Sequence, residues 1–159
     1  MKFADFVCPD AIIPELQSTD RDAVIEELVA AIARAGAIPK TRQKLLAAAV
    51  IERENEASTG MGKGIAVPHA KHKAVKKMVA AIGLSSKGID FSSLDKQPVY
   101  SVVLLLSPAD AADRHLQAME KIFRHLNQEK FRKFLRQCQT AEDVRELLKE
   151  ADEDPSLMQ

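Results

Sequence analysis

The chain has 159 residues, of which 46% are hydrophobic and 29% charged, a composition typical of one globular domain. Lys and Arg total 23, as do Asp and Glu, so the net charge of zero gives no electrostatic indication of a nucleic-acid-binding or anionic-membrane-binding protein. No apolar run approaches the roughly 20 residues of a membrane span, the N-terminus lacks a signal-like segment, and Cys8 and Cys138 have no CxxC spacing. We therefore expect a cytoplasmic protein with reduced, structural thiols and no direct membrane insertion.

Helical periodicity dominates the N-terminal third of the chain. Apolar residues at helical spacing predict a helix over residues 19–36, with Thr19 or Asp20 as its cap and Gly36 at its end. Beyond Pro39, Thr41 is placed to cap a second helix that runs to about residue 55.

The middle of the chain carries short apolar runs that read as buried strands, at residues 65–67, 79–84 and 100–106. Turn residues fill the segment 85–98 between the last two. Helical spacing returns over residues 110–127 and 131–135, and a last helix opens at Thr140, with Asp143 three residues later as a weak capping box. Residues 151–159 have no such pattern and are predicted to be a tail.

This order of elements predicts an α/β fold in which helices cover one small mixed β-sheet. Nothing in residues 1–159 reads as a linker, so we expect a single domain with its core at about residues 5–150.

A glycine-rich segment, STGMGKGIAVPH, occupies residues 58–69. Closely spaced glycines allow successive backbone N–H groups to converge on an anion, which is one interpretation of Gly60, Gly62 and Gly64. The spacing fits neither GxxxxGK[ST] nor a GxGxxG that opens a helix, since Pro68 interrupts the chain. A plain turn between two elements is the alternative.

His69 follows Pro68 at the end of the predicted short strand, a position where α/β folds often carry functional groups. A neutral imidazole can attack phosphorus and hold the group as a phosphoramidate, whereas a structural histidine is the alternative. His69 and His72 have i, i+3 spacing and His115 offers a third nitrogen, but no Cys or paired carboxylate completes a metal-ligand set. We therefore expect neither a metal nor a cofactor.

The segment RENEASTGMGKGIAVPH resembles the active-site signature of enzyme IIA of the bacterial phosphoenolpyruvate-dependent phosphotransferase system, in its fructose/mannitol/nitrogen-regulatory class. The resemblance continues through GIDFSSLDKQPVYSVVLLLSPADAADRHL and covers about residues 5–150. One departure is Lys96, which stands where the family usually has glycine. The resemblance implies the mannitol-type enzyme IIA fold.

The resemblance also implies roles for individual residues. His69 would be the phosphoryl acceptor, through Nε2, and His115 the neighbouring histidine that stabilises the group. Arg53 would bind the phosphoryl oxygens with its planar fork of N–H donors. Thr59 matches the hydroxyl position of the signature, and Ser58 beside it is a weaker candidate. His72 and His125 are interpreted as surface or structural residues.

By the same resemblance, the protein is a phosphotransferase component that accepts phosphate from phospho-HPr. A stand-alone nitrogen-regulatory enzyme IIA that controls other proteins is one function that fits. The alternative is a sugar-specific (fructose/mannitol-type) enzyme IIA that passes the group to a separate enzyme IIB during sugar transport. A third is a regulatory binding module without transfer activity.

Overall fold

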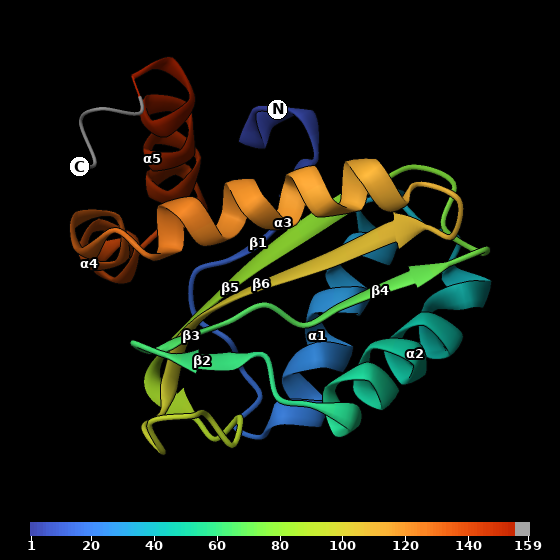
Figure 1. The fold of residues 1–159 in the computed structure, drawn as a ribbon, viewed down its shortest axis with the longest axis horizontal. Helices are drawn as coiled ribbons and strands as arrows, with labels where there is room; N and C mark the ends of the chain where they lie inside the picture. Colours follow the sequence, from blue (N-terminus) through green and yellow to red (C-terminus); the bar gives the residue numbers. More distant parts are fainter. Residues whose placement is uncertain (155–159) are drawn as a thin grey trace.

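The computed structural model describes residues 1–154, in which a six-stranded mixed sheet lies between two layers of helices (Figure 1). The strands are β1 (Val7–Ile13), β2 (Gly60–Gly62), β3 (Ile65–Ala66), β4 (His69–His72), β5 (Val79–Ile89) and β6 (Val99–Pro108). The helices are α1 (Arg21–Arg34), α2 (Gln43–Glu56), α3 (Ala112–Leu126), α4 (Glu129–Gln137) and α5 (Ala141–Glu153), with short 3₁₀ turns η1 (Phe3–Asp5) and η2 (Lys40–Arg42). The predicted α/β fold with a small mixed sheet is confirmed.

The centre of the sheet is the antiparallel pair β5 and β6. β1 adds to β5 in parallel at one edge, and β3 adds to β6 in parallel on the other side, followed by the antiparallel β2. β4 also pairs with β6, in the same register as β3, because Ile65 lies opposite Ser101 and His69 opposite Leu105. β3 and β4 are thus two pieces of one line beside β6, separated by Val67 and Pro68.

Each face of the sheet has its own apolar core. Along β6, Val102, Leu104 and Leu106 pack beneath the α1/α2 layer. Val103 and Leu105 point the other way, into the cluster formed with α3, α4 and α5. Since both faces are covered, β5 and β6 are apolar at successive positions, and this explains why continuous apolar runs predicted them.

Several helix ends follow the capping signals in the sequence. Asp20 caps α1 by accepting a hydrogen bond from the backbone N–H of Ala23 at 2.9 Å. Thr140 and Asp143 form a complete capping box at the start of α5, as the sequence predicts. Gly36 follows α1 with φ of 82°, a left-handed conformation that favours glycine.

The expected Thr41 cap of the second helix is wrong. Thr41 lies inside the 3₁₀ turn η2, and α2 begins at Gln43 with Arg42 as its N-cap and no side-chain cap hydrogen bond.

Two parts of the sheet differ from the sequence expectation. β1 was not expected, because Pro9 and Asp10 interrupt its apolar residues; the structure accommodates them with a register shift between Val7 and Ile12 on an edge strand. β5 also continues to Ile89, through part of the segment expected to be a turn, with a register shift after Leu84.

The C-terminal helix extends past the expected tail boundary at residue 151. Ala151 is fully buried, and the carboxylate of Asp152 accepts hydrogen bonds from the backbone N–H groups of Phe3 (2.8 Å) and Ala4 (3.1 Å). Asp152 also pairs with Lys121 at 3.2 Å. These hydrogen bonds hold α5 against the N-terminal turn η1. The rest of the predicted tail, residues 155–159, lies outside the described residues.

Both cysteines are free thiols, each half-buried. Burial, with a smaller effect of Asp143, raises the pKa of the Cys138 thiol to about 11, which makes it a poor nucleophile at neutral pH. Over residues 1–154, no helix combines the length and the apolar character that crossing a membrane requires.

Candidate active site

His69 is the first residue of β4, directly after the break between β3 and β4. The sequence placed it at the end of a strand, whereas the structure has it begin one. The reason is Pro68, which has no N–H to donate to the sheet and ends β3 early. Its carbonyl still accepts a hydrogen bond from Leu105 at 3.0 Å, so the break is short and His69 is held against β6.

The His69 ring is oriented by a contact with its own backbone neighbourhood. Its Nδ1 atom lies 2.8 Å from the carbonyl oxygen of Val67. A carbonyl can only accept, so Nδ1 carries the proton and the lone pair of a neutral ring is on Nε2. The outcome is an imidazole with one fixed tautomer and its nucleophilic nitrogen turned away from the backbone.

The surroundings of His69 favour the uncharged ring. Burial lowers its pKa below 6.5, and the positive charges of Arg53 and Lys71 lower it further. The hydrogen bond to Val67 and the charge of Glu54 act in the opposite direction and do not cancel the decrease in pKa. At neutral pH the side chain is therefore a free base.

His115 lies opposite His69, on the first turn of α3, with 8% of its surface exposed. The two ring centroids are 5.4 Å apart and the ring planes are inclined by 50°. Burial, followed by the effects of His69 and Lys71, lowers the pKa of His115 to about 4. Its Nδ1 atom is hydrogen-bonded to the hydroxyl of Ser107 at 2.7 Å, a residue that the sequence reasoning missed. The signal that could have pointed to Ser107 is its position directly after the predicted buried strand at residues 100–106.

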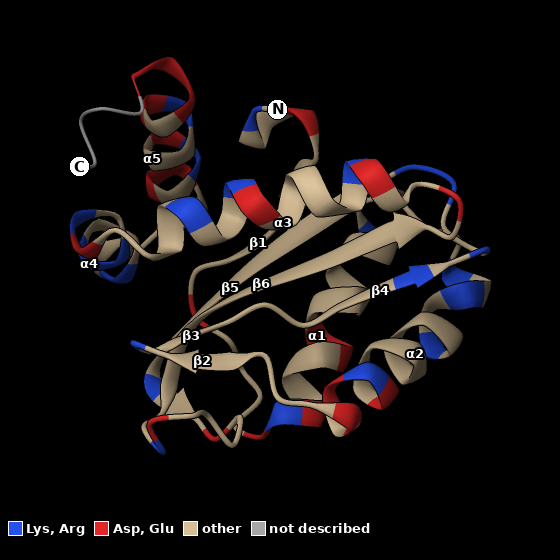
Figure 2. Ribbon diagram, in the orientation of Figure 1, with Lys and Arg blue, Asp and Glu red and all other residues tan. Residues whose placement is uncertain are grey.

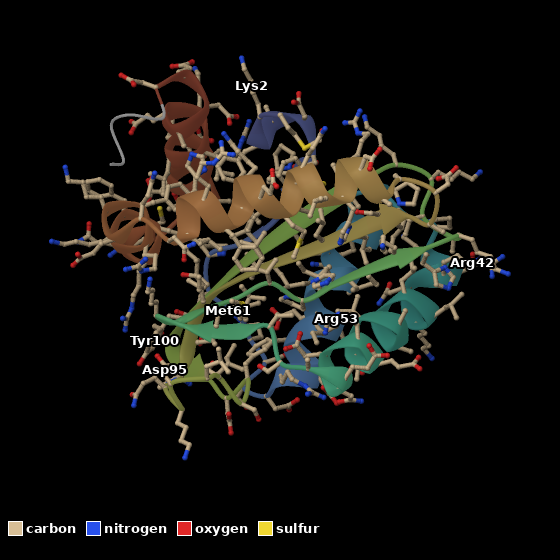
Figure 3. The ribbon with its side chains drawn as sticks, in the orientation of Figure 1. Lys2, Arg42, Arg53, Met61, Asp95 and Tyr100 are labelled. Carbon is tan, nitrogen blue, oxygen red and sulfur yellow. The ribbon has the colours of Figure 1, made fainter. Side chains whose placement is uncertain are left out.

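Arg53 occupies the last turn of α2, near the connection between β3 and β4 (Figure 3). One of its N–H groups donates to the carbonyl oxygen of Ala57 at 3.0 Å, just past the end of the helix. A guanidinium has five N–H donors, so most of them remain for another ligand. Because its charge acts on the pKa of His69, Arg53 lies within electrostatic reach of that ring.

Behind Arg53, a buried carboxylate that the sequence reasoning missed organises the glycine-rich segment. Glu54 is 2% exposed and accepts two hydrogen bonds from Thr59, one from its backbone N–H (2.6 Å) and one from its hydroxyl (2.9 Å). The same hydroxyl accepts from the backbone N–H of Val67 at 3.1 Å. The Thr59 side chain is thus engaged inside the protein, and its expected contact with a phosphoryl group stays a prediction.

Ser58 and the glycines shape the same segment. The Ser58 hydroxyl donates to the carbonyl oxygen of Phe91 and accepts from the N–H of Gly60 at 3.0 Å. Its phosphoryl contact also stays a prediction. The glycines form the β2–β3 hairpin, in which a Cβ at Gly60 would lie 2.4 Å from the Ser93 hydroxyl. The segment is thus a turn between two strands, and its binding of an anion stays a prediction.

The two remaining histidines lie elsewhere. His72 is half-exposed at the end of β4 and accepts a hydrogen bond from the N–H of Ala74 at 2.9 Å. His125 is 2% exposed and lies edge-on to Phe3 and Phe131, which is a structural position. Residues 1–154 contain no group of three or more potential metal ligands.

Exposed apolar and basic side chains lie on or near the elements that carry the two histidines. Leu116, beside His115 in α3, is 61% exposed, and Met61, in β2, is 54% exposed. Figure 2 shows positive charge along β4 and the connection that follows it, where the exposed residues are Lys71, Lys73, Lys76 and Lys77. Of these lysines, Lys71 acts on the pKa of both histidines, so positive charge is present at the histidine pair.

The comparisons with known proteins agree with this arrangement. Residues 5–151 match the family model described as phosphoenolpyruvate-dependent sugar phosphotransferase system, EIIA 2. The chain belongs to this family of phosphotransferase components.

The relatives at the level of sequence are of two kinds. The chain is 32% identical over 148 residues to a nitrogen regulatory protein of Bradyrhizobium diazoefficiens, covering 93% of this chain and 95% of that one. It is 30% identical over 152 residues to the fructose-specific EIIABC component of Bacillus subtilis, covering 96% of this chain. In the second case the chain spans only 24% of the relative's length.

Solved structures share the fold. The nitrogen regulatory protein IIA-Ntr of Neisseria meningitidis superposes with a TM-score of 0.83 at 25% identity, covering 92% of this chain and 98% of that one. The IIA mannitol structure of Escherichia coli, at 19% identity, has a TM-score of 0.74 over 89% of this chain and 97% of its own. The predicted family and the mannitol-type fold are confirmed.

Proposed function

We propose that the protein is a phosphoryl carrier that accepts a phosphoryl group from phospho-HPr on Nε2 of His69, and that it acts as a nitrogen-regulatory-type enzyme IIA. The observation that carries this proposal is the 2.8 Å contact between His69 Nδ1 and the Val67 carbonyl oxygen. This contact directs the lone pair of a neutral histidine outward, which is what nucleophilic attack on phosphorus requires.

The reaction is an exchange between two imidazoles. The Nε2 lone pair attacks the phosphorus of the phosphohistidine on the donor, and the donor's N–P bond breaks as the new N–P bond forms. The departing imidazole keeps the electron pair of the broken bond, and no proton needs to move in this step. The geometry required is in-line, so catalysis depends mainly on positioning and on donors for the three equatorial oxygens.

We propose that Arg53 and His115 supply those donors. The Ser107 hydroxyl is fully buried and the nitrogen of His115 is its hydrogen-bonding partner, so the hydroxyl donates to Nδ1 and leaves the proton of His115 on Nε2. That Nε2–H then donates to a phosphoryl oxygen, while Arg53 contributes charge and a second set of N–H groups. Thr59 and Ser58 remain the candidate hydroxyl ligands.

The donor must reach the pair of histidines by docking on the surrounding surface. Met61 and Leu116 are exposed apolar side chains, and they supply contact area to a small partner protein. We expect loss of these two side chains to weaken docking while leaving the chemical step unchanged.

The regulatory function is favoured over sugar transport by the similarity to nitrogen regulatory proteins. That similarity extends over nearly all of both chains in sequence and in structure. A sugar-specific enzyme IIA is the second candidate, because the chain also resembles fructose-specific components, among them the EIIA component of Haloferax volcanii at 39% identity over 105 residues. A binding module without transfer is disfavoured, since Arg53, His69 and His115 are all present at one site.

The proposal is tested by intact-mass measurement after incubation with phosphoenolpyruvate, enzyme I and HPr. One phosphoryl adduct is expected on the wild type and on the control His72→Ala, and none on His69→Ala. A folded wild-type protein that gains no adduct would leave the binding module as the better explanation.

The two carrier functions are separated by adding a purified fructose-type enzyme IIB to the phosphorylated protein. Retention of the phosphoryl group supports the regulatory function, whereas rapid stoichiometric transfer to the enzyme IIB supports sugar transport.

A further inference from the structure

The buried carboxylate of Glu54 has no role in the transfer as described, and the hydroxyl of Thr59, a candidate phosphoryl ligand, is already hydrogen-bonded to Glu54 and Val67. We propose that Glu54 and Thr59 are positioning residues, which hold Val67 so that its carbonyl fixes the tautomer and orientation of His69. The expected effect on the rate of phosphoryl transfer rests on the proposed function, whereas the expected effect on the tautomer of His69 does not.

The contacts form one continuous chain from Glu54 to the imidazole. The carboxylate accepts from the N–H and the hydroxyl of Thr59, at 2.6 and 2.9 Å. The Thr59 hydroxyl accepts from the Val67 N–H at 3.1 Å, and the Val67 carbonyl accepts from His69 Nδ1 at 2.8 Å. Each link is local, and together they connect the end of α2 to the proposed nucleophile.

Val67 needs such a partner because it lies in the break between β3 and β4. It is fully buried, and it has no place in the β3 or β4 ladders along β6 that would pair its N–H. The Thr59 hydroxyl satisfies this N–H and thereby restrains the residue whose carbonyl meets the ring. Without it, a buried N–H would be left unpaired, which a protein avoids by moving the backbone.

The series of hydrogen bonds from residue 54 to His69 requires a carboxylate at residue 54. Thr59 presents two donors to residue 54, its N–H and its O–H, and an ionised carboxylate can accept both at once. The hydroxyl proton is thereby committed to Glu54, so the Thr59 oxygen is free to accept from Val67. A glutamine offers one acceptor and one donor, and it would leave the hydroxyl proton or the Thr59 N–H without a partner.

Matched variants test this arrangement. Thr59→Ser keeps the hydroxyl, Thr59→Val removes it at nearly constant size, and Glu54→Gln removes one acceptor. Glu52→Gln is the control, because Glu52 is an exposed carboxylate on the same helix. Thermal unfolding identifies any variant that does not fold. If Thr59→Val does not fold, Glu54→Gln and Thr59→Ser carry the comparison, and if Glu54→Gln does not fold, Thr59→Val and Thr59→Ser carry it.

The first readout is the ¹⁵N chemical shifts of the His69 ring in the unphosphorylated protein above pH 7. Wild type, Thr59→Ser and Glu52→Gln are expected to show the single tautomer with Nδ1 protonated. Thr59→Val and Glu54→Gln are expected to show averaged shifts from two tautomers. This readout needs no phosphoryl donor, so it stands even where the proposed transfer fails.

The second readout is the rate of phosphoryl transfer from phospho-HPr. For Thr59→Val and Glu54→Gln we expect kcat to fall on the order of tenfold to a hundredfold with KM nearly unchanged, since small misplacements of a reacting group have effects of this size. Thr59→Ser should transfer the phosphoryl group at the wild-type rate, because it keeps the hydroxyl. A single unchanged tautomer in folded Thr59→Val and Glu54→Gln would overturn the inference, as would a loss confined to KM.

Discussion

The imidazole rings of His69 and His115 lie 5.4 Å apart, centroid to centroid, although one belongs to β4 and the other to α3. Both are neutral at pH 7, because burial lowers the pKa of each. The hydrogen bonds on their Nδ1 atoms differ, however, and they give the rings complementary roles. The Val67 carbonyl leaves the lone pair of His69 on Nε2, and in the proposed function the Ser107 hydroxyl donates to Nδ1 of His115 and leaves the proton of that ring on Nε2.

Replacing His115 tests this division of roles. For His115→Ala we expect the kcat of phosphoryl transfer to fall on the order of a hundredfold, the usual effect of removing one donor to a developing anion. KM for phospho-HPr should change little, because His115 is buried and contributes little docking surface. Steady-state kinetics with His72→Ala as the control measures both constants. A variant that changed KM alone would place His115 in docking instead.

The ionisation of His69 gives a second prediction. Since burial and the charges of Arg53 and Lys71 lower its pKa, the midpoint at which the ring gains its proton should lie below pH 6.5. A titration followed by ¹H–¹⁵N NMR of the ring nitrogens measures the midpoint directly. A midpoint above 6.5 would mean that the ring is charged near neutral pH, contrary to the proposed nucleophile.

The same pKa shifts predict how stability depends on pH. His115 has a folded pKa of about 4, below its unfolded value, so between these two pH values the unfolded chain binds more protons than the folded one. The free energy of unfolding therefore falls as pH decreases through this window, and His115 accounts for about 2 kcal/mol between pH 7.5 and 5. His69 and His125 act in the same direction.

Urea unfolding at pH 7.5 and pH 5 measures this difference, and His115→Gln serves as the comparison because glutamine does not titrate. The variant should lose less stability than the wild type over the same pH interval. Equal losses in the two proteins would show that His115 is not held neutral in the folded state.

The contact between the two chain ends gives a fourth prediction. The side chains of Asp152 and Lys121 are 7% and 10% exposed, so removing one charge leaves the other buried and unpaired. We expect Asp152→Asn to lower the free energy of unfolding by about 3 kcal/mol, whereas the exposed Glu150→Gln should have little effect. Because both lie away from His69, the phosphorylated fraction of the folded protein should be unchanged. Equal stabilities for the two variants in urea would contradict this account.

Much of the fold follows from local patterns in the sequence. Asp20 and Thr140 mark the starts of α1 and α5, and the apolar runs of β5 and β6 mark the strands that are buried on both faces. β1 could not be predicted in this way, because Pro9 and Asp10 break its pattern and its pairing with β5 is a long-range contact. β1 therefore depends more on its pairing with β5 than on the strand preference of its own residues.

The site shows the same limit. The resemblance implies roles for Arg53 and His69, which stand in the signature, and for His115, which stands in the later HL step, and these roles stay predictions. Glu54 and Ser107 were missed because their importance comes from partners, Thr59 and His115, that only the folded chain brings within hydrogen-bonding distance. Burial of Glu54 cannot be recognised from the sequence at the end of α2, where the neighbouring Glu52 and Glu56 are exposed, as most glutamates are.

The central claim is that Nε2 of His69 receives the phosphoryl group, and NMR of the phosphorylated protein tests it most directly. The protein is labelled with ¹⁵N in its histidine rings and phosphorylated through enzyme I and HPr, and the ³¹P–¹⁵N coupling is then measured. We predict coupling to Nε2 of His69 alone, with Nδ1 still hydrogen-bonded to the Val67 carbonyl. Coupling to Nδ1 of His69, or to a nitrogen of His72 or His115, would contradict it.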